Sequence, residues 1–210
     1  MLGFFSFTEV TDPAAHRAYN EWHQFDHLPE QFSLDGMLFG QRWVCTPACR
    51  TARVAVGPLL EPCHYMTLYL MRDAAVLEPF AALARRLRQE DRFFSARHAH
   101  LSGPFAVAGR WVSPRIALSS GALPFRPSTG IYVVVGPALD GAALVGQDGV
   151  AGAWAFVDEA SDDEAARRHI TVAFLDGDLP ATATTLGQWC LQTGESMEWA
   201  GPLEGIDPNR

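Results

Sequence analysis

The first half of the chain carries the apolar patterns of alternating strands and helices. Residues 2–10, "LGFFSFTEV", are aromatic and β-branched and indicate a strand. Asp12 and Pro13 suit the N-cap and first position of a helix that we expect to continue to about residue 28. Pro29 disfavours helical geometry at the residue before it, so the pattern predicts a kink or break there.

The remaining segments of this half complete a βαββαβ order. Strands are predicted at 37–45, 64–72 and 104–112, a second helix at 75–89, and a long loop at 46–62. This order is that of the ferredoxin-like split unit.

The second half repeats the pattern of the first half in a weaker form. Residues 113–129 are rich in Pro, Ser and Gly and are predicted to be a linker. After them we expect four strands and one helix, with a short glycine-rich segment in place of the first helix: strands 130–136, 152–158, 169–178 and 196–202, helix 181–192, short segment 137–150.

We therefore predict an α+β fold of tandem ferredoxin-like βαββαβ repeats, 1–112 and 130–210, separated by the linker 113–129. Each four-stranded sheet would leave one apolar face uncovered, and packing sheet against sheet buries both. The expected result is a pseudo-dimeric α/β barrel with a cavity between the sheets, formed within the chain, or else in a homodimer.

Composition narrows the class of protein. The 210 residues are 48% hydrophobic and 19% charged, as in globular domains. The net charge of −8 disfavours binding to nucleic acid or to an anionic membrane surface. No apolar run reaches the roughly 18–20 residues that cross a bilayer, and the first residues lack a signal-peptide pattern. We expect a cytoplasmic protein whose partner is a small molecule.

The cysteines do not have the spacing of a metal site. Cys45, Cys49 and Cys63, with His64, depart from the usual C-x2-C pairs of zinc sites, so reduced thiols are expected. Phosphate-binding glycine loops, nucleophile elbows and C-x-x-C pairs are missing from the sequence. We expect neither a bound metal nor another cofactor.

The segment 19–30, "YNEWHQFDHLPE", is the densest in titratable groups. On a helical wheel drawn at about 100° per residue, the apolar residues of this helix form a stripe that is separate from its solvated face. The stripe contains Ala14, Ala15, Ala18, Trp22 and Phe25. The titratable groups occupy the shoulder beside it: His16, Tyr19, His23, Asp26 and His27, joined by Glu30 if the helix continues past Pro29.

Such a shoulder is suited to lining a cleft and to proton transfer. Tyr19, His23 and His27 follow one another at i, i+4 spacing, and Asp26 lies where a carboxylate can orient a histidine and raise its basicity. Two alternatives remain at this stage. The acids can form ion pairs with the histidines on a wet surface, or His23, His27 and a carboxylate can bind a metal; the familiar zinc helix, however, has Glu where Gln24 stands.

The same segment resembles a known family. "YNEWHQFDHLPEQFSLDGMLFGQRW" is similar to the Y-N-x-W…E-H-x-P…G-F…R-R-Y pattern of EthD-like and related dimeric α/β-barrel proteins, at these positions: Tyr19, Asn20, Trp22, His27, Pro29, Gly36 and Arg42. Asp26 replaces the family's Glu, and Trp43 replaces its aromatic residue after Arg. The resemblance covers about residues 1–112. It implies that His27 faces a cavity between sheet and helices.

Other side chains are candidates for binding the substrate: Trp22, Glu30, Arg42, Trp43, Tyr65, Tyr69, His98 and His100. Arg42 and Trp43 alternate on a strand, so one of them faces inward, and an inward Arg binds a carboxylate or enolate. Tyr65 and Tyr69 share one strand face, as His98 and His100 do in an extended segment. Core packing and solvent exposure are the alternative roles of these residues.

The sequence therefore supports three functional hypotheses. The first is a cofactor-free enzyme with His27, Asp26, His23 and Tyr19 in catalysis, acting as a cyclase, isomerase or dehydratase on a small apolar carbonyl or aromatic compound. The second is a small-molecule-binding or stress-related protein without chemistry. The third, a metal- or haem-dependent enzyme, rests only on histidines without an assigned role.

Overall fold

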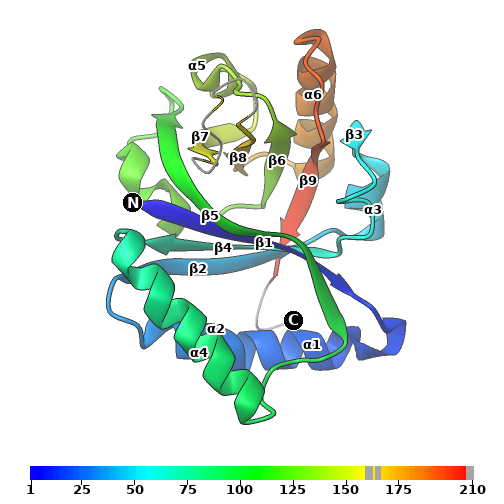
Figure 1. Ribbon diagram of the computed structural model, residues 1–210. Helices are drawn as coiled ribbons and strands as arrows, with labels where there is room; N and C mark the ends of the chain where they lie inside the picture. The colour runs from blue at the N-terminus through cyan, green and yellow to red at the C-terminus, as the bar shows by residue number, and fades with distance from the viewer. Residues whose placement is uncertain (159–162, 164–166, 207–210) are drawn as a thin grey trace.

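The computed structural model describes residues 1–158, 163 and 167–206. It is an α+β structure built on antiparallel strands (Figure 1). The strands are β1 Leu2–Val10, β2 Met37–Val44, β3 Ala55–Val56, β4 Tyr65–Met71, β5 Arg97–Val112, β6 Gly130–Gly136, β7 Val150–Val157, β8 His169–Leu175 and β9 Trp199–Gly205. The α-helices are α1 His16–Trp22, α2 Leu28–Phe32, α3 Pro47–Thr51, α4 Leu77–Gln89, α5 Gly141–Leu144 and α6 Leu179–Gln192.

The strands close into a barrel. Their order is β2-β4-β1-β5-β7-β8-β6-β9, and β2 pairs again with β9, which joins the two ends in a ring of eight strands. The closing pairs are Trp43 with Gly205 and Val44 with Glu204. The short β3 is attached to β9 outside this ring. The two pairs of β2 with β9 close the ring at the end of β2.

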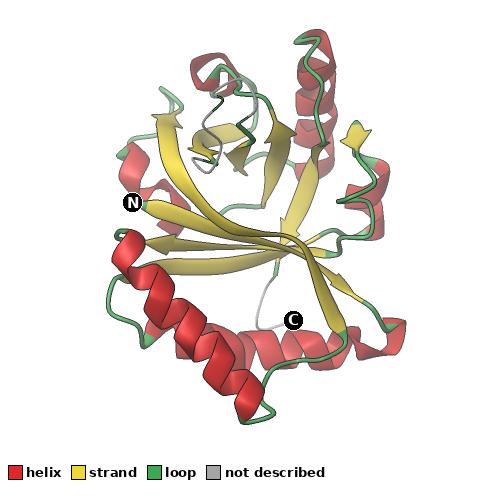
Figure 2. Cartoon of the chain, in the orientation of Figure 1, coloured by secondary structure: helices red, strands yellow, loops and turns green. Residues whose placement is uncertain are grey.

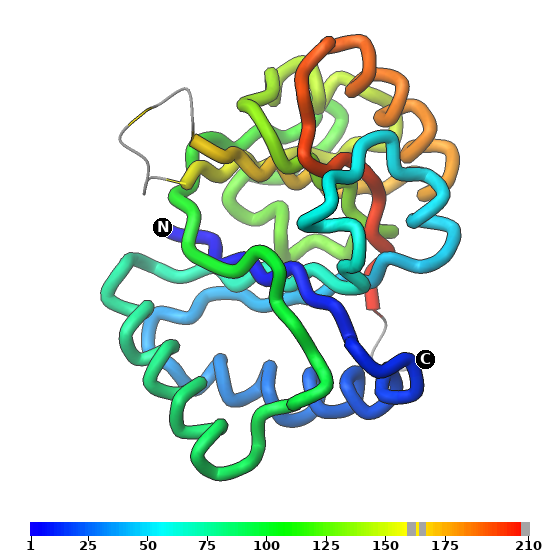
Figure 3. Tube along the Cα trace, turned by 45° about the vertical axis from the view of Figure 1, so that its right-hand side comes forward, coloured from blue at the N-terminus to red at the C-terminus, as the bar shows by residue number. Residues whose placement is uncertain are grey.

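Each half of the chain contributes four neighbouring strands. The N-terminal four run β5-β1-β4-β2 and the C-terminal four run β9-β6-β8-β7, which is the same relative order. Strand β5 is 16 residues long and pairs with β1 at one end and with β7 at the other. It therefore passes from one half into the other, as the green segment of Figure 3 shows.

Apolar side chains from both halves pack inside the barrel. Phe5 and Leu68 come from the first half, Phe156 and Val172 from the second, and all four are fully buried. The rings of Phe5 and Phe156 meet edge to face at 4.9 Å between centroids. The sequence led us to expect a cavity between the two sheets. This packed cluster occupies that space, and the cavity described below lies outside the barrel.

Helices cover the outer faces of the sheet. The segments α1, α2 and α4 lie under the N-terminal strands, and α6 lies beside β6 and β9 in the other half (Figure 2). Close approach of α2 to the sheet depends on Gly40 of β2: a Cβ there would stand 2.8 Å from Leu28 and 2.9 Å from Tyr69.

Most strands and helices begin and end near the predicted positions. The Asp12 side chain caps the first helical turn, with Pro13 at its first position, as predicted. The segment 46–62 is not a plain loop, because it contains α3 and β3. The predicted strand 104–112 begins earlier, at Arg97. The glycine-rich segment 137–150 holds only the four-residue α5.

The segment 113–129 connects β5 to β6. It contains a 3-10 helix, Ser120–Phe125, and its Leu123 is fully buried against the barrel core. The proposed division of the chain at this segment stays a prediction. Among the described helices, none combines the length and the apolar character needed to cross a bilayer.

Candidate functional site

The first helical segment continues through Pro29 and ends at Phe32, so of the expected kink or break at Leu28 the break is wrong, and the helix is irregular just before the proline. Between α1 and α2, residues His23–His27 form a π-helical turn in which the Leu28 N–H donates to the carbonyl of His23, five residues earlier. Pro29 has no N–H and its ring crowds the carbonyl of Phe25, so a wider turn here lets the helix pass the proline. Such turns are frequent at functional sites.

The face that this helix buries is not the expected one. Phe25, placed in the apolar stripe by the helical wheel, is 66% exposed. The buried side chains are instead those of Tyr19, His23, His27, Leu28 and Gln31. The expected shoulder is therefore the face that packs on the sheet. The reason lies in the sheet: its outer face presents tyrosine, threonine and serine hydroxyls and a cavity, which accommodate polar side chains.

A cavity of about 480 Å³ lies between this helix, α4 and the outer face of β1, β4 and β5. Its size is that of a site for a small organic ligand. The walls are mostly aromatic and aliphatic, with hydroxyls, two imidazoles and three guanidinium groups. The lining residues are Phe4, Ser6, His23, His27, Gln31, Thr67, Tyr69, Leu77, Phe80, Ala81, Ala84, Arg85, Arg88, Phe93, Arg97, Ser102 and Pro104.

His23 is the deeper of the two histidines, with 2% of its surface exposed. Its Nε2 lies 3.5 Å from both Thr67 Oγ1 and the Tyr69 hydroxyl, at the long limit of a hydrogen bond. Burial and the positive charge of Arg42 hold the pKa of His23 well below its ordinary value. Burial raises the pKa of Tyr69, which therefore keeps its proton. Both groups are neutral at pH 7.

His27 lies one turn further along the same wall. Its ring stacks on Trp22, with 4.5 Å between centroids and 21° between planes, and meets Phe93 edge-on. Burial, followed by the charges of Arg97 and Arg42, lowers the pKa of His27 to about 3. The imidazole is therefore a neutral proton acceptor. In the described part of the chain, neither His27 Nδ1 nor His23 Nδ1 has a hydrogen-bond partner.

Arg42 faces the helix, the inward alternative considered for it, but does not line the cavity. Its guanidinium lies 5.0 Å from the ring centroids of Tyr19 and Tyr65, and the residue is 2% exposed. None of its nitrogens has a hydrogen-bond partner among the residues described here. Its positive charge lowers the pKa of both His23 and His27, although its side chain does not line the cavity.

The acidic residues expected at the site lie elsewhere. Asp26 is exposed, and in the described structure no hydrogen bond or ion pair joins it to a histidine, so this geometry gives no support to an orienting role. Glu30 forms ion pairs with Arg92 at 2.6 Å and with Arg86 at 3.5 Å. It belongs to a surface charge network that joins α2 to the end of α4 and the segment after it.

Of the predicted aromatic residues, some support the site and others do not reach it. Tyr69 lines the cavity and Trp22 backs His27, whereas Tyr19 is fully buried behind the wall. Trp43 points to the opposite face of β2 and packs in the barrel core.

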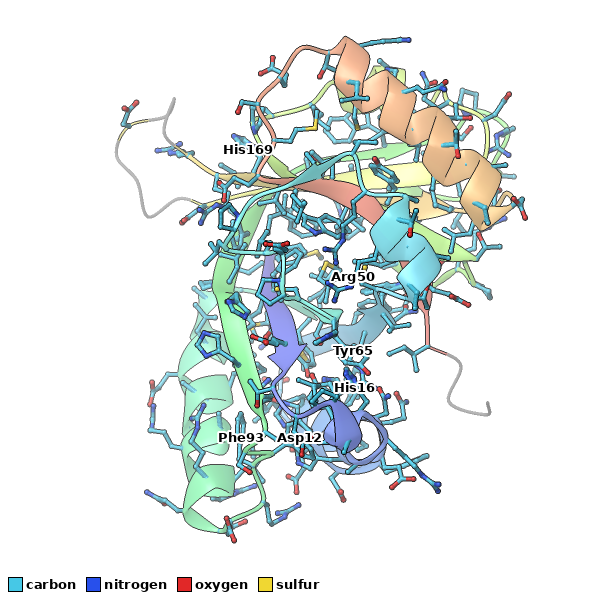
Figure 4. The ribbon with its side chains drawn as sticks, turned by 90° about the vertical axis from the view of Figure 1, so that its right-hand side faces the viewer. Asp12, His16, Arg50, Tyr65, Phe93 and His169 are labelled. Carbon is cyan, nitrogen blue, oxygen red and sulfur yellow. The ribbon has the colours of Figure 1, made fainter. Side chains whose placement is uncertain are left out.

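Tyr65 lies at a second, more open hollow. Its hydroxyl accepts from Asn20 Nδ2 at 3.1 Å and lies 3.0 Å from His16 Nδ1. Figure 4 shows Tyr65 and His16 together, with Arg50 nearby on α3. The sequence placed Tyr65 and Tyr69 on one strand face. The structure confirms that face and separates the two hydroxyls into different surroundings.

A β-bulge keeps His98 and His100 away from the cavity. Phe7 pairs with Leu101 and Thr8 with Ala99, so His100 is the extra residue of β5. The bulge reverses which alternate side chains face the helices. Arg97 and Ser102 consequently line the cavity, whereas His100 bonds Glu9 at 2.8 Å and contacts His98 on the other face.

Sequence reasoning missed the cationic part of the site. Arg88 and Arg97 line the cavity and both lie over the ring of Phe93: their guanidinium carbons lie 4.3 and 4.5 Å from its centroid. Figure 4 places Phe93 beside the end of α4. A usable signal was present, because residues 85–97 hold five of the 16 basic residues.

The four cysteines are free and buried. Burial raises the pKa of Cys63 to about 12, so this thiol stays protonated. Within the described residues, no group of three or more His, Cys, Asp or Glu side chains is placed to hold a metal ion.

No protein-family model and no curated protein matches the sequence. Among solved structures, a "putative monooxygenase" from Lactobacillus acidophilus NCFM has a TM-score of 0.45 and 8% identity, over 97% of this chain and 93% of that one. A similarity this distant assigns neither an activity nor a ligand to this chain.

Proposed function

We propose that this protein is a small-molecule enzyme that moves protons without a cofactor, with His27 and His23 as the proton-transferring groups. The observation that carries the proposal is the pair of neutral, buried imidazoles on the wall of a 480 Å³ cavity whose other walls are largely apolar. Perturbed titratable groups facing a cavity are typical of catalytic sites.

The proposed reaction begins with removal of an acidic proton next to a carbonyl group or on an aromatic hydroxyl. The neutral imidazole of His27 accepts this proton, and the oxyanion that develops is stabilised by the cavity's arginines and by the O–H of Tyr69. Return of the proton to another atom completes an isomerisation; loss of water or ring closure from the same anion gives a dehydration or a cyclisation.

Arrival of negative charge makes His27 a better base. The pKa of His27 is about 3 partly because Arg97, Arg42 and Arg88 disfavour a further positive charge. An anion bound beside Arg88 and Arg97, the two of these that line the cavity, offsets their field and raises the pKa of the imidazole toward its ordinary value. Proton transfer is then favoured only with the substrate in place.

We also propose that the chain is an EthD-like protein and that it divides into two repeats. The equal strand order of the two halves supports tandem ferredoxin-like repeats, 1–112 and 130–210, in a pseudo-dimeric barrel. Residues 207–210 lie outside the described residues. His27 beneath the sheet is also where the resemblance to EthD-like proteins expects it.

Hydrogen exchange of model substrates tests the catalytic proposal. Small cyclic and aromatic ketones in D₂O, followed by proton NMR, report loss of the acidic hydrogen whichever reaction comes next. We expect His27→Ala to slow catalysed exchange by about 10²–10⁴, the usual contribution of a placed base. Asp26→Asn, a change in the same turn but on the exposed side, is the control and should retain the wild-type rate.

Equal exchange by wild-type protein and a folded His27→Ala variant would exclude His27 as the base. It would favour the second candidate, a binding protein without chemistry. One observation already favours that alternative: His23 Nδ1 and His27 Nδ1 have no partner among the described residues that could carry a proton away. A ligand at 100 times its Kd adds about 2.7 kcal/mol of stability, so thermal-shift screening detects ligands under either proposal.

A further inference from the structure

The basic residues around the cavity differ in whether an acidic residue neutralises them. Five arginines lie between residues 85 and 97. Arg85 pairs with Glu78 at 2.7 Å, and Arg86 and Arg92 both pair with Glu30. Arg88 and Arg97 have no carboxylate partner in the described part of the chain. These two unneutralised arginines both line the cavity.

Phe93 fixes the two guanidinium groups without occupying their hydrogen-bond donors. A guanidinium over an aromatic face is attracted to the ring, and its N–H groups stay free. Both distances to the Phe93 centroid, 4.3 and 4.5 Å, are within the range of this interaction. The donors of Arg88 and Arg97 are thus held in place and remain available to a ligand.

No carboxylate lines the cavity to balance these charges, since its described lining contains neither Asp nor Glu. The contrast with the whole chain is large, because the net charge is −8. A local positive site in an acidic protein selects for a small anion that fits inside and against extended polyanions, which the rest of the surface repels.

We propose that the ligand of this cavity is a small carboxylate with a flat, apolar ring, held by Arg88 and Arg97. The planar fork of a guanidinium matches the two oxygens of a carboxylate, and the cavity lining also offers Leu77 and Phe80, nearer the start of α4, and Phe4 of β1 to the ring. This assignment rests on the proposed function insofar as the ligand is the substrate.

Matched pairs of probes test the requirement for an anion. Benzoate, cyclohexanecarboxylate and naphthalene-2-carboxylate are compared with their carboxamides, which have nearly the same shape and no charge. Isothermal titration calorimetry gives Kd for each. We expect wild-type protein to bind at least one carboxylate about tenfold or more tighter than its amide, as charge-assisted hydrogen bonds imply.

Substitutions then locate the anion site. Arg88→Gln and Arg97→Gln should each weaken carboxylate binding about tenfold and leave amide binding unchanged. Arg86→Gln is the matched control, on the same helix but paired with Glu30 and outside the lining, and should bind as wild type does. Arg97→Lys, which retains the charge, should recover part of the affinity.

The two proposals fail in different ways. Failure of wild-type protein to bind any carboxylate, binding of amides with equal affinity, or unchanged affinity in both glutamine variants would overturn the anion assignment. Loss of carboxylate binding in those variants, together with hydrogen exchange that His27→Ala does not slow, would leave the anion site standing and remove the catalytic proposal. His27→Ala itself should still bind the carboxylate, because the imidazole does not neutralise it.

Discussion

At the scale of single residues, the cavity histidines combine low basicity with a position that a base requires. A buried imidazole loses hydration when it becomes charged, and three arginines add repulsion to that cost. The folded protein therefore keeps His23 and His27 neutral at acidities where an unfolded chain would protonate them. Because of these low pKa values, we expect the free energy of unfolding to decrease as the pH falls.

The sign of this effect follows from linkage. Between about pH 6.5 and pH 3 the unfolded chain binds a proton at residue 27 that the folded protein excludes, so stability falls as the pH falls. One such histidine contributes a slope of at most about 1.4 kcal/mol per pH unit in this window. We expect His27→Asn to remove most of that slope, measured as the free energy of unfolding in urea from pH 4 to pH 7. Identical slopes in variant and wild type would show that the folded protein protonates His27 readily.

At the scale of elements, the π-helical turn decides which side chains after His27 face the sheet. A regular helix turns about 100° per residue, and one inserted residue shifts every later side chain by that angle. The turn spans His23–His27, so the positions after it no longer follow the wheel drawn from Tyr19. Leu28 and Gln31 consequently pack on the sheet, on the same side as Tyr19 and His23.

Two substitutions in this segment should differ sharply. Leu28 is 8% exposed and packs with Tyr69, Met71 and Val76, so Leu28→Ala should cost about 2–5 kcal/mol of unfolding free energy. Phe25→Ser should change it by less than about 0.5 kcal/mol, because the ring is 66% exposed. Chemical denaturation monitored by circular dichroism measures both. A large loss of unfolding free energy in Phe25→Ser would instead show that Phe25 is buried, as the regular helical wheel predicts.

The same contrast explains what sequence could and could not reveal. Strands such as β4 and β6 are continuous apolar runs, so their positions were predictable to within a few residues. The density of titratable groups around His23 and His27 marked the right segment. The buried face was predicted incorrectly because the wheel treats phenylalanine as core, and the positions after His27 were misplaced because it assumes one constant turn angle.

The arginines of the cavity were hidden for a related reason. Arg97 reaches the cavity only because the bulge at His100 changes the alternation along β5, and a bulge leaves little trace in the sequence. Arg88 lies at the last turn of α4, where a basic residue is ordinarily explained by the helix dipole. Their shared contact with Phe93 depends on tertiary packing.

At the scale of the whole molecule, the site depends on a barrel that neither half completes. Trp43 closes the barrel by pairing with Gly205. Its indole side chain packs in the same core as Trp154 from the second half. The outer face of β1 and β4 carries the cavity, while the inner face of the same strands is buried against β7 and β8. A destabilising substitution in the second half should therefore also destabilise the site in the first half.

A cavity in the shared core tests this coupling. Phe156 is fully buried and touches Phe5 across the barrel, so Phe156→Ala should cost about 3–5 kcal/mol. If the barrel unfolds as one unit, amide hydrogen exchange measured by mass spectrometry should speed up in β1 and β4 as well as in β7 and β8. Leu191→Ala, in the same half but 64% exposed, is the control and should leave exchange unchanged. Acceleration confined to β7 and β8 would mean that the halves open independently, and the cavity beneath β1 and β4 would then owe its stability to the first half alone.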